Sequence, residues 1–102
     1  MTKRVLMMGV ALTGMVAASV ALAEPTGEML AQTCAGCHGT RGELSQPSAF
    51  MPLAGMAEAT FVKAMKDFQS GARPSTLMGP IAKGFTESEF QAMASYYAKQ
   101  KK

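Results

Sequence analysis

The stretch Cys34-Ala35-Gly36-Cys37-His38 places two thiols and one imidazole within five residues. Such groups can close a disulfide, bind a metal ion, perform thiol redox chemistry or hold a prosthetic group covalently. A disulfide at this spacing closes so small a ring that it constrains the unfolded chain little. A structural zinc site needs about four Cys or His ligands, and the sequence holds two Cys and one His. A thioredoxin-like pair needs a βαβ context, and no strand pattern is found.

The spacing C-x-x-C-H is typical of covalent haem c attachment. Cys34 and Cys37 would form thioether bonds to the two vinyl groups. His38, the only histidine, would bind the iron from the same helical turn. Its other ring nitrogen needs a hydrogen-bond acceptor to fix the ring orientation, and we expect a backbone carbonyl from the loop 47–52. The sequence therefore predicts one haem c.

The second axial ligand is expected to be a methionine, because a second histidine does not exist. The methionines after residue 23 are Met29, Met51, Met56, Met65, Met78 and Met93. Those within predicted helices read as packing residues, as methionine usually is, and Met51 and Met56 follow His38 too closely. Met78 lies forty residues after His38, between Pro74 and Pro80. A His38/Met78 pair would raise the redox potential and leave no open position on the iron.

The elements that must position these residues are predicted to be helices. We expect helices over residues 24–37, 57–71 and 85–102, joined by loops over 38–56 and 72–84. Thr26 is the expected cap of the first helix, and Thr86 with Glu89 forms a capping box at the start of the last. The second helix would be capped by Thr60 or Glu58 and end near Gly71.

Apolar residues recur at helical spacing in two of these segments. They are Phe61, Ala64, Met65 and Phe68 in the second helix, and Phe90, Met93, Ala94 and Tyr97 in the last. The predicted fold is therefore all-α, with three main helices and long loops wrapped around the haem.

Residues 1–23 have the pattern of a cleaved secretory signal peptide. Lys3 and Arg4 precede a long run of apolar and small residues, which ends in Ala-Leu-Ala before Glu24. A membrane-anchoring helix over residues 5–22 is the alternative. Cleavage leaves one domain, residues 24–102, and predicts a periplasmic protein with no membrane span.

The mature chain would have 79 residues, with eight Lys and Arg against seven Asp and Glu. This near-neutral balance leaves no basic stripe that would indicate nucleic-acid binding.

The order Gly27, Leu30, Ala31, Cys34, Cys37, His38, Gly39, followed by Pro52-Leu53-Ala54-Gly55, resembles class I cytochromes c of the c4/c553 group. The later stretches 71–73 and 76–84 are similar to the cytochrome subunits of flavocytochrome c sulfide dehydrogenases. This resemblance implies that Met78 is the axial ligand and that Pro52 supplies the acceptor for His38. It also implies that the first and last helices cross, with Gly27 against Tyr96 or Tyr97.

The resemblance implies a function as well. The chain would carry a single haem c and would not be catalytic alone. It would form a heterodimer with a flavoprotein subunit that holds the FAD and oxidises sulfide. Electrons would pass from the flavin to this chain and then to an acceptor cytochrome.

Two other functions remain open from the sequence. The chain could be a free soluble cytochrome that shuttles electrons between other periplasmic or membrane partners. It could also be a haem enzyme or ligand sensor with a labile sixth position. Arg73 could pair with a haem propionate or be solvated. The loop 51–56, Ala35 and Gly36 could form a docking surface or only line the haem pocket.

Overall fold

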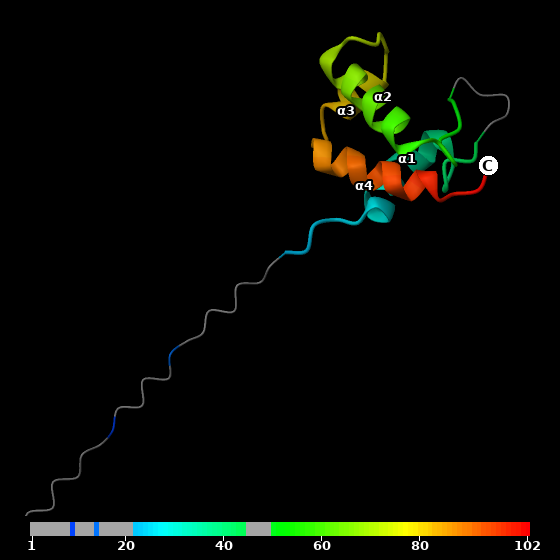
Figure 1. The fold of residues 1–102 in the computed structure, drawn as a ribbon. Helices are drawn as coiled ribbons and strands as arrows, with labels where there is room; N and C mark the ends of the chain where they lie inside the picture. The colour runs from blue at the N-terminus through cyan, green and yellow to red at the C-terminus, as the bar shows by residue number, and fades with distance from the viewer. Residues whose placement is uncertain (1–8, 10–13, 15–21, 45–49) are drawn as a thin grey trace, which may run out of the picture.

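The residues that the structure describes form four helices (Figure 1). The computed structural model describes residues 22–44 and 50–102, together with Gly9 and Gly14. The helices are α1 (Gly27–His38), α2 (Glu58–Ser70), α3 (Met78–Ala82) and α4 (Glu87–Ala98). α4 packs against both α1 and α2, and α3 packs against α2. Since the described residues contain no strand, the all-α prediction is confirmed.

Helix α1 begins at Gly27 and ends at His38, so it starts three residues later and ends one residue later than predicted. The Thr26 side chain accepts a hydrogen bond from the N–H of Met29 at 3.2 Å, which confirms the predicted cap. The helix ends at His38, and Gly39 follows with φ of +94°, which favours glycine. The Cys-x-x-Cys-His segment therefore forms the last turn and a half of a regular helix.

The predicted crossing of α1 and α4 is confirmed. A Cβ atom added to Gly27 would lie 2.1 Å from the carbonyl oxygen of Ala92 and 3.3 Å from Cβ of Tyr96. Only glycine allows the two backbones to approach this closely. The buried Tyr97 hydroxyl donates a hydrogen bond to the Ala31 carbonyl at 3.1 Å, so the two helices are also joined by a polar contact.

Helix α4 confirms the other local predictions. Thr86 and Glu89 form both hydrogen bonds of the capping box, at 3.2 and 2.9 Å. Phe85 packs against Phe90, with ring centroids 6.4 Å apart, as a hydrophobic staple requires. The helix ends at Ala98, so the predicted continuation to residue 102 is wrong. Its predicted apolar face is fully buried: Phe90, Met93, Ala94 and Tyr97.

The predicted cap of α2 is wrong. Both Glu58 and Thr60 lie inside the helix, and the N-cap is Ala57, which makes no side-chain hydrogen bond. The helix is therefore held by packing, with Phe61, Val62 and Met65 buried. Its end at Gly71, in the left-handed conformation, agrees with the prediction.

The segment predicted as a loop over 72–84 contains the short helix α3, which corrects that prediction. Gly79 and Pro80 indicated a break, but they are the second and third residues of α3. N–H groups in a first helical turn have no partner within the helix, so Pro80 loses nothing there. Ser75 accepts a hydrogen bond from the N–H of Gly79 at 2.6 Å and stabilises the start of the helix.

Within the part of the chain that the structure describes, no helix is both long and apolar enough to cross a membrane. The predicted signal peptide, and the alternative of an anchoring helix over residues 5–22, fall almost wholly outside the described residues.

Candidate functional site

The last turns of α1 face a largely apolar cavity of about 320 Å³. Cys34 and His38, four residues apart, are buried on the same face of the helix, whereas Cys37 is exposed. Both cysteines are free thiols. The cavity is lined by Thr33, Cys34, Cys37, His38, Phe50, Met51, Leu53, Met56, Thr60, Phe61, Ala64, Met65, Phe68, Arg73, Leu77, Met78 and Ile81. The structure thus brings together five of the six predicted site residues; Pro52 is the exception.

The imidazole of His38 is held by a backbone carbonyl from the predicted loop. Its Nδ1 lies 2.6 Å from the carbonyl oxygen of Met51. A carbonyl can only accept, so Nδ1 carries a proton, and in the neutral imidazole Nε2 then has the lone pair that a metal ion binds. The hydrogen bond therefore fixes the ring orientation, as it does for histidines that bind metal ions.

The prediction that Pro52 supplies this acceptor is wrong. The N–H groups of Leu53 and Ala54 both donate to the carbonyl of Gly42, at 2.7 and 3.0 Å. These two bonds fix the segment so that the carbonyl of Met51, one residue earlier than predicted, faces the ring.

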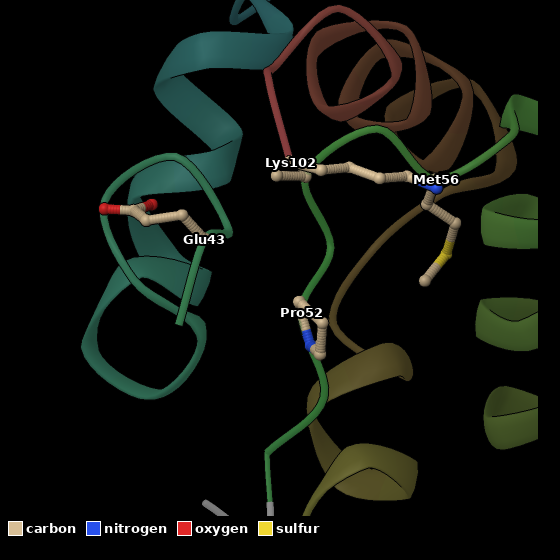
Figure 2. A pocket seen from close by; sticks show the side chains of 5 residues that line it. Glu43, Pro52, Met56 and Lys102 are labelled. Carbon is tan, nitrogen blue, oxygen red and sulfur yellow. The ribbon is translucent and has the colours of Figure 1, made fainter. Parts of the chain in front are cut away.

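Pro52 instead lines a second hollow, with Glu43, Ala54, Met56 and Lys102 (Figure 2). The Arg41 N–H donates to the Glu43 carboxylate at 2.6 Å. Hydrogen bonds from the backbone N–H groups of Glu43 and Arg41 lower the pKa of Glu43. Among the described residues, Met56 alone lines both this hollow and the apolar cavity.

Gly42 is a residue that the sequence analysis missed. Its φ is +73°, and an added Cβ would lie 2.8 Å from both Cβ of Leu53 and Cε1 of Tyr97. Any side chain at this position would clash with Tyr97 of α4 and with Leu53, two residues after the Met51 carbonyl that contacts His38. The signal in the sequence is only a single glycine in a polar stretch.

Four methionines line the cavity: Met51, Met56, Met65 and Met78. Met51 lies on the Nδ1 side of His38, away from the ring nitrogen that is free for a metal. Met65 is buried in the core against α4 and is only 4% exposed. Met78 is the first residue of α3.

The positions of α1 and α3 favour Met78 over the others. These two helices do not pack against each other, although both line the cavity. His38 on α1 and Met78 on α3 thus reach the same cavity from helices that are not in contact.

Arg73 lies at the cavity with its guanidinium over the Phe68 ring, 4.7 Å from the centroid. Among the described residues that line the cavity it is the only one with a permanent positive charge. A cation–π contact of this kind holds the side chain near the ring. Arg73 is thus an exposed residue placed where an anionic edge of a bound group could reach it.

The mouth of the cavity carries exposed apolar side chains that sequence reasoning found only in part. Met51, in the predicted docking loop, is 46% exposed, and Leu77 and Ile81 around α3 are 55% and 41% exposed. The last two were missed because their segment was read as a loop. No group of three His, Cys, Asp or Glu side chains able to bind a metal is found in the described ranges.

The residues present fit a covalently bound haem c. Two free thiols and an imidazole lie on one helix end, the imidazole presents an unprotonated nitrogen, and the facing walls are apolar. Two Cys and a following His in one helical turn are the donor set that such attachment needs, and an apolar pocket of this size suits a bound cofactor.

No protein-family profile matches the chain. Individual proteins do: a cytochrome subunit of sulfide dehydrogenase from Chlorobaculum tepidum is 42% identical over 72% of this chain and 66% of its own length. A cytochrome c-553 from Helicobacter pylori is 32% identical over 81% of this chain and 86% of its own length. A cytochrome c-554(548) from Halomonas halodenitrificans is 31% identical, with shares of 72% and 92%.

The chain spans just under two thirds of the sulfide dehydrogenase subunit, and one third of a thiosulfate dehydrogenase electron acceptor from Thiomonas intermedia that is 36% identical. The two smaller cytochromes, by contrast, are matched over most of their length. Together with the all-helical fold and the Cys-x-x-Cys-His cavity, these matches show that the chain belongs to the class I cytochromes c, electron-transfer proteins, and carries one covalent haem c.

Proposed function

We propose that Cys34 and Cys37 bind the haem through thioether bonds and that His38 and Met78 are its axial ligands. When bound, haem c supplies a one-electron Fe(III)/Fe(II) couple. The observation that carries this proposal is that His38 on α1 and Met78 on α3 line one apolar cavity, although the two helices do not pack against each other.

The protein's own residues have distinct tasks in this scheme. The Met51 carbonyl orients the His38 ring through Nδ1, so that Nε2 would be the nitrogen available to the iron of a bound haem. The apolar walls exclude water, and the two ligands leave no open coordination position.

The proposed role is that of an electron-relay subunit in the periplasm. A signal peptide over residues 1–23 would direct export of the chain to that compartment. In this role the chain receives single electrons from the FAD of a flavoprotein partner that oxidises sulfide, and delivers them to an acceptor cytochrome. Similarity to a protein named as a cytochrome subunit of sulfide dehydrogenase supports this choice. The exposed apolar mouth formed by Met51, Leu77 and Ile81 would be the docking surface.

A free soluble electron shuttle is the second candidate. It is supported by the matches to cytochromes c-553 and c-554(548) over 86% and 92% of their lengths.

Recovery of the tagged, haem-loaded protein from a periplasmic extract of its native host distinguishes the two roles. The relay role predicts that FAD co-purifies and that added sulfide reduces the haem in the recovered complex. The Met51→Ser variant should retain less FAD, whereas Met29→Ser, which alters an exposed methionine outside the cavity, should retain as much as the unaltered protein. Recovery of a flavin-free cytochrome that sulfide does not reduce would favour the shuttle.

A further inference from the structure

Helix α3, which carries Met78, is too short to be stable by itself. It has five residues, and isolated helices of this length do not persist in water. Its N-cap residue, Leu77, makes no side-chain hydrogen bond. The position of Met78 must therefore be fixed by groups outside the helix.

Gln69 on α2 supplies such a contact at the end of α3. Its Nε2 lies 3.1 Å from the carbonyl oxygen of Ala82 and 3.0 Å from that of Phe85. Both partners are acceptors, so the amide nitrogen, with two N–H groups, is the atom that faces them. The last carbonyls of a helix have no partner within it. Gln69 donates to one of them, that of Ala82, and to the carbonyl of Phe85 beyond the helix end.

Ser75 supplies a contact at the other end, where its hydroxyl accepts from the N–H of Gly79 at 2.6 Å. The two side chains thus hold α3 at both ends, and Met78 is the first residue of the helix, next to the Gly79 N–H that Ser75 holds. Packing of α3 on α2 adds to this, since Ala82 is completely buried.

We propose that Gln69 is a positioning residue for Met78: by joining α2 to the end of α3 it holds the thioether toward the iron. This inference rests on the proposed axial role of Met78. Residues that orient a metal ligand change metal affinity by about 10- to 100-fold when they are replaced. Loss of the Gln69 bonds should therefore increase the fraction of molecules in which the thioether has left the iron.

The test is imidazole binding to the oxidised, haem-loaded protein. Imidazole competes with the sixth ligand, so its apparent affinity rises in proportion to the fraction of molecules with that position free. Gln69→Leu keeps a similar volume but cannot donate, and we expect its imidazole affinity to be about tenfold higher. Gln69→Glu, which is acceptor-only when ionised, should raise the imidazole affinity at least as much. This second variant provides the test if Gln69→Leu does not fold.

The matched control is Gln100→Leu. Gln100 also donates from Nε2 to a carbonyl, that of Tyr96 at 2.9 Å, but this contact lies at the end of α4 and not on α3. The control should bind imidazole as the unaltered protein does. A merely structural role for Gln69 would lower the unfolding midpoint and leave imidazole affinity unchanged.

Met78→Ala, measured in parallel, separates the two proposals. If it removes the absorption band of Met–Fe(III) ligation while Gln69→Leu and Gln69→Glu bind imidazole with unaltered affinity, the role of Gln69 is refuted and the axial role stands. If Met78→Ala keeps that band, the axial role is refuted, and the positioning role falls with it.

Discussion

The two walls of the haem cavity are built in different ways. The His38 wall is a capped helix of 12 residues, crossed closely by α4 at Gly27 and joined to it by Tyr97. The Met78 wall is a helix of five residues with exposed Leu77, held by the side chains of Gln69 and Ser75. The proposed His38 ligand is fixed by the core of the fold, and the proposed Met78 ligand by packing on α2 and a few hydrogen bonds. Destabilising changes to the protein should therefore disturb the Met78 wall before the His38 wall.

Loss of both thiols should have the largest effect, because it removes the covalent attachment of the haem to the His38 wall. The Cys34→Ala/Cys37→Ala double variant cannot form thioether bonds, so no haem should remain on the chain after denaturation. Haem staining of a denaturing gel measures this directly. The Met78→Ala variant is the control, since it should keep its stain. A stained band for the double cysteine variant would contradict covalent attachment at these residues.

Gly27→Ala should break the His38 wall. The added methyl group would lie 2.1 Å from the Ala92 carbonyl, so α1 and α4 must separate. Overpacking of this kind costs about 1–3 kcal/mol or more in unfolding free energy. Urea denaturation of the haem-loaded protein would measure the loss. Gln32→Ala, on an exposed position of the same helix, should stay within about 0.5 kcal/mol; equal stability of the two variants would argue against the close crossing.

Tyr97→Phe should have a smaller effect on the same wall. It removes the hydrogen bond to Ala31, a change worth about 1 kcal/mol. Burial also raises the pKa of the Tyr97 hydroxyl above its ordinary value. The folded state therefore favours the protonated form, and the unfolded state releases the proton above about pH 10.

This protonation gives Tyr97 a pH-dependent contribution to stability. Its contribution is complete below about pH 10 and falls as the pH rises further, because the unfolded state then binds fewer protons. Tyr97→Phe should lose stability less steeply than the unaltered protein between pH 9 and pH 11 (about one unit either side of that value), as followed by urea denaturation. An identical alkaline slope in both proteins would show that Tyr97 makes no such contribution.

Local signals in the sequence predicted much of the His38 wall. The Thr26 cap, the Thr86–Glu89 box and the C-x-x-C-H turn each depend on residues a few positions apart, and each is present. The glycine at the crossing was anticipated from a resemblance rather than from a local rule.

The features that were missed depend on contacts between distant segments. Gly42 fixes the Met51 carbonyl through Leu53 and Ala54, so the acceptor for His38 could not be placed by counting residues. Helix α3 forms where Gly79 and Pro80 argue against a helix, and it is held by Gln69 from 13 residues away in the chain. Neither contact can be predicted from residues that are neighbours in the sequence.

The most direct test of the two-sided site is the visible spectrum of oxidised Met78→Ala. The account predicts that this variant keeps covalent haem but loses the absorption band of Met–Fe(III) ligation. Met56→Ala, which alters another methionine of the same cavity, should keep that band. A Met78→Ala spectrum that retains the band, or its loss in Met56→Ala instead, would contradict the assignment of α3 as the ligand-bearing wall.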